Sequence, residues 1–126
     1  MTPQPNIDSV DAFDLTILRD RIPRDQDAGG DPSVGSKVLF NFGSTELGIW
    51  DMGVGAMYDV EIDEAFVVLE GEGTVDVLDA SGLVAETTVL RAGIVGRLYA
   101  GTRTRWTVTR TLRKVYIAPA EAPTQA

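Results

Sequence analysis

The chain has 126 residues, the size of one domain that can bury a core without disulfides or metals. It contains neither cysteine nor histidine, which excludes disulfides, thiol nucleophiles, imidazole metal ligands and Ser-His catalysis. The formal net charge of -8, from 11 basic and 19 acidic residues, repels phosphate backbones and anionic lipid surfaces, so we expect no nucleic-acid and no membrane partner.

The first 36 residues are expected to form an N-terminal arm and loop. Within the arm, residues 13–17 alternate apolar and polar side chains, which is typical of an edge strand. Residues 23–36 are rich in glycine, proline and aspartate and predict a turn-rich loop. The start of the chain has no basic stretch followed by an apolar one, and no apolar run reaches membrane-span length, so we expect a cytoplasmic protein.

From Lys37 onward, short apolar segments alternate with turn residues, which predicts an all-β sandwich or barrel with under a tenth of its residues in α-helix. Glycines punctuate this region, and those at 71 and 73 predict a turn between two strands. The Ala/Pro-rich tail, residues 119–126, is expected to be disordered. The predicted strands cover residues 37–42, 46–52, 57–62, 65–70, 74–78, 86–90, 94–99, 103–108 and 113–117.

Four acidic residues fall within six positions, directly before the apolar segment 66–69. A strand that is apolar on both faces is central in a sheet, so these carboxylates lie either on a solvated rim or at the edge of a binding cavity. The four are Asp59, Glu61, Asp63 and Glu64.

On the predicted strand 103–108, Thr104, Trp106 and Val108 share one face, which we expect to point inward. Trp106 could be a core residue or a platform for a ligand, and its indole N–H needs a partner in either case. Buried charges must be paired. Lys114 and Arg97 are therefore the natural counter-ions for Glu64 or for an anionic ligand.

Two groups of residues resemble the motifs of the cupin superfamily of small β-barrels. Gly53, Glu64 and Gly71 fit the first motif, G-x5-HxH-x3,4-E-x6-G, and Gly93 and Gly101 fit the second, G-x5-PxG-x2-H-x3-N. The metal-binding histidines are missing: Thr104 replaces the histidine of the second motif, Tyr99 the proline and Val108 the asparagine. The ending TRTRWTVTRTLRKVYI resembles the bacterial single-domain cupins grouped with ureidoglycine aminohydrolase and the ethanolamine-utilisation cupins.

The resemblance implies a cupin-type jelly-roll β-barrel over residues 37–118. Because the histidines are missing, we expect no metal and no cofactor. The two histidine positions of the first motif fall on Tyr58 and Val60, on Met57 and Asp59, or on Asp59 and Glu61, depending on the register. Glu64 would point into the barrel, as a general base or oxygen ligand, or as one half of a salt bridge. Asp59 or Glu61 could supply a second oxygen. The expected ligand-binding residues are Tyr58, Glu61, Glu64, Phe66, Arg97, Thr104, Trp106, Lys114 and Tyr116.

Three functional hypotheses follow from these features. The first is a metal-free barrel that binds a small polar organic molecule. The second is an enzyme (a lyase, isomerase or aminohydrolase) acting on a small carboxylate or ureido compound, with Glu64 as base and Tyr58 or Tyr116 as acid. The third is a structural role in which the pocket is vestigial. Because small open barrels leave sheet edges that need cover, we also expect a homodimer in which strand 13–17 lies across the partner.

Overall fold

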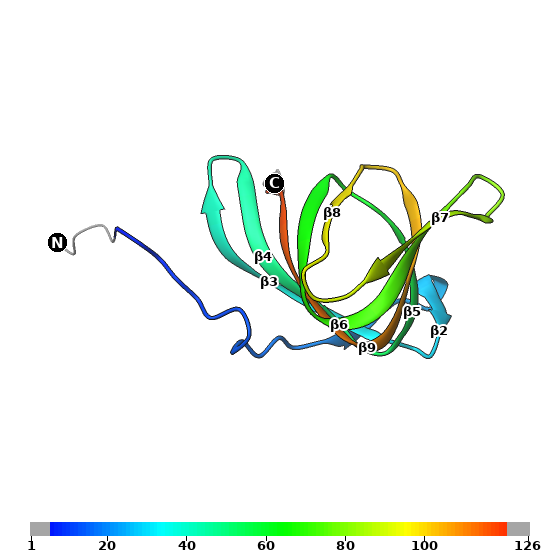
Figure 1. Cartoon of the computed structure of the whole chain (residues 1–126), viewed down its shortest axis with the longest axis horizontal. Coiled ribbons are helices and arrows are strands. Elements are labelled where there is room, and N and C mark those ends of the chain that lie inside the picture. Colours follow the sequence, from blue (N-terminus) through cyan, green and yellow to red (C-terminus); the bar gives the residue numbers. More distant parts are fainter. Residues whose placement is uncertain (1–5, 121–126) are drawn as a thin grey trace, which may run out of the picture.

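A computed structural model describes residues 6–120 of the chain (Figure 1). These residues contain no α-helix, which confirms the all-β prediction, and no helix that could cross a membrane. The strands are β1 (Asp20–Arg21), β2 (Asp27–Gly29), β3 (Ser33–Phe42), β4 (Thr45–Met52), β5 (Gly55–Val60), β6 (Glu64–Leu78), β7 (Val84–Leu90), β8 (Val95–Leu98) and β9 (Arg103–Pro119), with a 3-10 turn η1 (Arg24–Gln26) before β2.

Strand β9 is the centre of the sheet, and it is paired antiparallel along both edges. One edge carries β4 and then β5, which follow each other along its length, and the other edge carries β6. Trp106, for example, lies between Met57 and Val75. Beyond these, β3 and β2 continue the sheet from β4 and β5, while β8 and β7 continue it from the two halves of β6.

The long strands β6 and β9 bend in the middle, and the pairing register between them shifts from Val68 to Gly73. A Cβ at Gly71 would collide with the carbonyl oxygen of Thr111, and Gly71 also has a φ of +101°. The predicted turn at 71–73 is therefore wrong. The glycines allow a close backbone approach at a bend rather than a chain reversal, so segments 65–70 and 74–78 form one strand, as do 103–108 and 113–117.

This bend makes the two halves of the sheet face each other, and the strands curve into an open half-barrel, with β3 and β4 on one side and β5 and β2 on the other (Figure 1). The core fills the space between the halves. Trp106 lies at its centre, with its ring 5.6 Å from that of Trp50 and 5.9 Å from that of Phe66.

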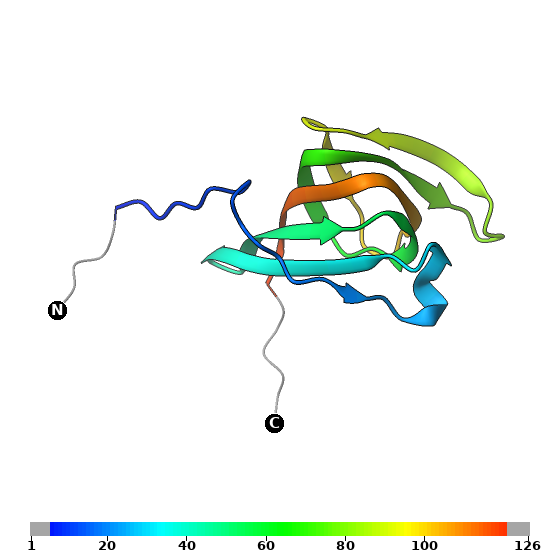
Figure 2. The same ribbon diagram turned by 90° about the horizontal axis from the view of Figure 1, so that it is seen from below.

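The N-terminal segment differs from the prediction. Residues 13–17 form no strand; the segment begins in a turn, closed by a hydrogen bond from the Asp14 N–H to the Asp11 carbonyl, and runs outside the barrel in Figure 2. The alternating pattern is misleading because Phe13 stays 61% exposed and finds no apolar face to pack on. The first strand is instead the two-residue β1 on the edge of β3. The homodimer stays a prediction, but the strand 13–17 that was expected to lie across the partner does not form.

The predicted loop 23–36 also has more structure than its composition indicated. It contains η1 and β2, and β3 begins at Ser33, four residues before Lys37. The buried side chain of Ile22 anchors this segment to the core. At the other end, Pro119 belongs to β9 and the N–H of Ala120 donates to the carbonyl of Ser44. The remainder of the predicted tail, residues 121–126, lies outside the described residues.

Candidate functional site

The two sheet halves enclose a cavity of about 220 Å3, here called the inner cavity. Its walls come from β4, from the end of β5 and the loop after it, from the start of β6, and from both halves of β9. Apolar and charged side chains converge there, as in small-molecule sites. The lining residues are Trp50, Asp59, Val60, Glu61, Ile62, Glu64, Trp106 and Lys114.

Strand alternation explains why these side chains meet. Residues opposite each other in neighbouring strands share a face. Trp50 pairs with Lys114, and Asp59 pairs with Thr104, which is 1% exposed and so marks the inner face. The β5 residue Asp59 therefore points into the barrel, which excludes the register that placed Tyr58 and Val60 at the two histidine positions.

Among the described residues that line the inner cavity, Lys114 is the only cation. Its ammonium lies 2.6 Å from Glu64 Oε2, and the two side chains are 4% and 12% exposed. This confirms the predicted pairing of Glu64 with Lys114. The Lys114 Nζ also lies 4.5–4.9 Å from the ring centroids of Trp106, Trp50 and Phe66. Because aromatic faces attract cations, the three rings offset part of the cost of burying the ammonium.

Glu61 is buried in the same cavity but has no cationic partner among residues 6–120. Its Oε2 accepts two neutral hydrogen bonds, from Thr104 Oγ1 at 2.6 Å and from Trp106 Nε1 at 2.9 Å. The indole N–H of Trp106 thus finds its expected partner. Glu61 and Thr104 were both predicted as site residues, but no sequence signal indicated that they bond each other.

Asp59 is the third carboxylate of the inner cavity. Burial and the neighbouring Glu61 charge raise the pKa of Asp59 from its usual 3.8 to about 6, while the Val60 N–H and Lys114 oppose the shift. Its Oδ1 accepts a hydrogen bond from Val60 N at 2.8 Å. Asp59 can therefore change its protonation state close to neutral pH.

Replacing Asp59 with asparagine is expected to stabilise the fold at pH 7. A raised pKa means that the folded chain binds more protons than the unfolded chain between pH 3.8 and about 6, so this group lowers stability as pH rises through that window. The full shift would correspond to about 3 kcal/mol, and partial solvation of Asp59 reduces this to about 1 kcal/mol.

Urea unfolding of wild type and Asp59→Asn at pH 4 and pH 7 measures this effect. The variant should gain stability over wild type as pH rises, whereas Glu86→Gln, an exposed acid on β7, should show no such trend. A difference between Asp59→Asn and wild type that is the same at both pH values would contradict the assignment.

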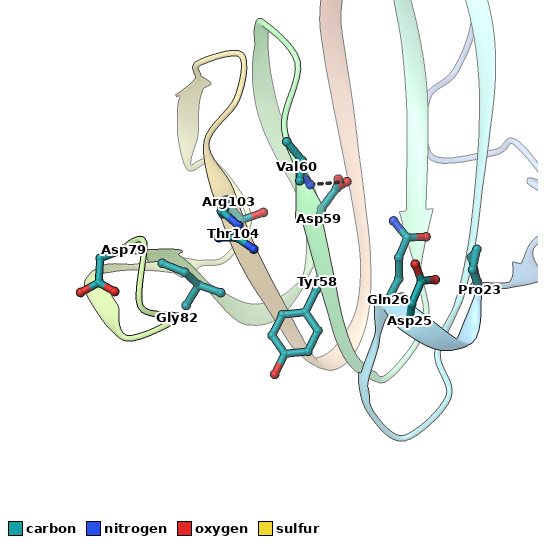
Figure 3. A pocket seen from close by; sticks show the side chains of 11 residues that line it. Pro23, Asp25, Gln26, Tyr58, Asp59, Val60, Asp79, Gly82, Arg103 and Thr104 are labelled. Atoms are coloured by element: carbon teal, nitrogen blue, oxygen red, sulfur yellow. Dashed lines mark hydrogen bonds between the residues drawn. The ribbon is translucent and has the colours of Figure 1, made fainter.

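Several predicted site residues lie elsewhere. Tyr58 points to the outer face of β5, away from Asp59, and is 41% exposed (Figure 3). Arg97 lies on the outside of β8, where it pairs with Asp63 at 3.0 Å and not with Glu64. Both were expected to line the pocket, because the face of the sheet on which a strand residue lies cannot be assigned until the pairing register is known.

Phe66 and Tyr116 both lie toward the inside. Phe66 packs on Trp106 and Lys114 in the core, and the Tyr116 hydroxyl donates to Glu46 at 2.8 Å, outside the inner cavity. Glu46 was not predicted, because it lies in a strand whose inward face is otherwise apolar or glycine.

A second hollow, the outer hollow, surrounds Tyr58 (Figure 3). It measures about 660 Å3 and lies between η1 and the turn that joins β6 to β7. Its aspartate at that turn, Asp79, already accepts hydrogen bonds from Ser81 and Leu83, and Arg103 is solvent-exposed. Asp59 and Thr104 line the outer hollow, but the buried Glu61 and the Glu64–Lys114 pair line the inner cavity and not the outer hollow, so we take the inner cavity as the candidate site.

The inner cavity does not fit a transition metal. These ions favour imidazole or thiolate, and the chain has neither. Hard cations need several oxygens, but Glu64 is bound by Lys114 and one oxygen of Glu61 by two donors. Within residues 6–120 no group of three or more ligating side chains is arranged to hold an ion.

The curled antiparallel sheet and its inner cavity define a small bacterial cupin. The family model of the EutQ-like cupin domain matches residues 41–116, more than half of the chain, and the chain belongs to this family. No curated protein matches it in sequence.

Solved structures agree with the family. A putative ethanolamine utilization protein Q from Salmonella typhimurium LT2 is 26% identical, with a TM-score of 0.58 over 71% of this chain and 72% of that one. EutQ of Clostridium difficile is 18% identical, with a TM-score of 0.62 over 82% and 79% of the two chains. The polyketide cyclase RemF from Streptomyces resistomycificus is 17% identical, with a TM-score of 0.61 over 94% and 82%. The latter two support the fold alone.

Proposed function

We propose that this cupin binds a small polar organic molecule in the inner cavity and needs no metal to do so. The observation that carries the proposal is the convergence of Asp59, Glu61 and the Glu64–Lys114 pair on one cavity beside two tryptophans. Side chains that served stability alone would not need three carboxylates around one buried cation, because buried charge is costly.

The size of the inner cavity limits the ligand. At about 30 Å3 per water, a volume of about 220 Å3 holds roughly seven waters. A ligand that is fully enclosed would therefore have a similar number of non-hydrogen atoms. The rings of Trp50 and Trp106 provide apolar walls, and the charged groups provide orientation.

A thermal-melting screen of small polar metabolites, without added metal, tests this proposal. A ligand at one hundred times its Kd stabilises the native state by about 2.7 kcal/mol. Ile62 lines the cavity and is 58% exposed, so Ile62→Trp should narrow the entrance without disturbing the core. The matched control is Leu83→Trp, which adds the same bulk at an exposed position before β7.

We expect compounds that raise the melting temperature of wild type and of Leu83→Trp, but not of Ile62→Trp. If no compound stabilises wild type, or if Ile62→Trp responds as wild type does, the inner cavity is not a binding site.

An enzyme is the second candidate, and one observation favours it. The pKa of Asp59, raised to about 6, suits a group that exchanges protons near neutral pH. Glu64 fits less well as the base because it is held by Lys114. Of the two expected acids, Tyr58 lies on the opposite face of β5, and the Tyr116 hydroxyl donates to Glu46 outside the inner cavity. Turnover of a bound compound that is lost in Asp59→Asn would establish the enzyme.

A further inference from the structure

The inner cavity has an excess of negative charge. Three carboxylates line it, from Asp59, Glu61 and Glu64, against a single ammonium on Lys114. Glu64 and Lys114 neutralise each other at 2.6 Å. The charges that remain without a counter-ion in the described chain therefore belong to Asp59 and Glu61.

Lys114 is poorly placed to receive an anion. It is buried, it is bound to Glu64, and three aromatic rings lie within 5 Å of its Nζ. An anionic ligand would have to displace Glu64 and would then meet the other two carboxylates. Like charges in a poorly solvated site repel each other strongly.

Glu61 is open to a further donor. The residue is 7% exposed, and both of its hydrogen bonds end on Oε2. Its Oε1 accepts no hydrogen bond from residues 6–120. Every fully buried side-chain oxygen in this part of the chain has a hydrogen-bond partner, so Oε1 is not fully buried. Oε1 is therefore the part of this buried side chain that faces the cavity, ready to accept a hydrogen bond.

Building on the proposed function, we propose that the ligand of the inner cavity is a small organic cation, an ammonium or amidinium group on a short carbon skeleton. Glu61 Oε1 and Asp59 accept hydrogen bonds from the charged head. Trp50 and Trp106 pack against the skeleton, and their rings add the attraction of an aromatic face for a cation. Carboxylates and phosphates are excluded by the same groups.

Cation binding should be linked to the proton on Asp59. As pH falls through about 6, Asp59 becomes neutral and the cation loses one of its partners, so affinity should fall with it. Other titratable and charged groups line the same cavities as Asp59. They are Glu61, Glu64 and Lys114 in the inner cavity, Asp25, Asp79 and Arg103 in the outer hollow, and Asp20 and Arg21 on the side toward Ile22.

Three probes of equal chain length and different charge test the inference: n-butylammonium, n-butanol and butyrate, at matched ionic strength and pH 7.5. The readout is the NMR signal of the Trp106 indole N–H, which donates to Glu61 and so reports on the cavity itself. We expect n-butylammonium to shift this signal saturably, with weaker or no effect from n-butanol and none from butyrate.

Two conservative variants and one control complete the test. Glu61→Gln keeps an acceptor for Thr104 and Trp106 but removes the charge, and it should weaken n-butylammonium binding about tenfold or more. Asp59→Asn should abolish the pH dependence near pH 6. Glu86→Gln makes the same charge change on the exposed face of β7 and should leave binding within about twofold of wild type.

The outcomes separate the two proposals. Equal binding of n-butanol and n-butylammonium, or saturable binding of butyrate, would overturn the cation inference and leave the proposed function standing. Binding of n-butylammonium that Glu61→Gln and Asp59→Asn do not weaken would also overturn it. If neither these probes nor any compound of the metabolite screen binds, the inference and the proposed function both fail.

Discussion

Replacing Lys114 with methionine is expected to lower the free energy of unfolding by about 3–5 kcal/mol. The substitution removes the cation 2.6 Å from Glu64 and leaves a carboxylate that is 12% exposed without a partner. Methionine fills the space among Trp50, Phe66 and Trp106 with a flexible apolar chain, so loss of packing contributes little. The effect therefore measures the uncompensated charge, and urea unfolding at pH 7 gives its size.

Two further variants isolate that cause. Lys114→Met combined with Glu64→Gln should recover most of the lost stability, because no charge is then left unpaired. Arg97→Met breaks the exposed pair with Asp63, whose side chains are 47% and 52% exposed, and should cost about 1 kcal/mol or less. Equal losses for Lys114→Met and Arg97→Met would mean that the Lys114–Glu64 pair is solvated.

A loss of similar size, about 3–5 kcal/mol, is expected for Arg113→Met. Arg113 lies next to Lys114 on β9 but points to the opposite side, where it makes two hydrogen bonds of 2.8 Å to the carboxylate of Asp51. Both side chains are under 10% exposed. The third contact of the guanidinium, 3.0 Å to the carbonyl oxygen of Ala12, ties the N-terminal segment to the barrel.

The substitution should therefore have a second, local effect that a purely global loss would not produce. Amide hydrogen exchange in residues 6–19 should become faster in Arg113→Met even under conditions where the barrel stays folded. Arg113→Lys keeps the charge but cannot form the two-pronged contact, so it should lie between wild type and Arg113→Met. Arg110→Met, which breaks an exposed pair with Glu72 at 3.5 Å, is the control and should change neither property. Unaltered exchange in the N-terminal segment of Arg113→Met would show that the contact with Ala12 does not hold it.

Much of the fold was predictable because it depends on local pattern. The regular spacing of apolar segments and turn residues predicts an all-β domain, and the positions of Gly53, Glu64, Gly71, Gly93 and Gly101 indicate a cupin before any coordinates are considered. Glycine alone does not distinguish a turn from a bend, however. Gly71 needs its conformation because the backbone of Thr111 lies against it, and Thr111 is 40 residues away in sequence.

The site was predictable in part for the same reason. Missing cysteine and histidine define which ligands are impossible. The cupin motif places Glu64 inside the barrel, and Lys114 was one of two cations expected to pair with it. The positions of Tyr58 and Arg97 outside the inner cavity could not be predicted from the sequence. A shift of one residue in pairing moves a side chain to the other face of a strand, and neither strand carries a pattern strong enough to exclude that shift.

The sequence by itself thus determined the fold class, the absence of imidazole and thiolate chemistry, and the need to pair the inward charges. Only the tertiary structure decided which charges share one space. Asp59 and Glu61 meet Thr104 and Trp106 because β5 pairs with β9 in one particular register, across more than 40 residues of sequence. Pairing between distant strands depends on packing of the whole sheet, and no local pattern encodes it.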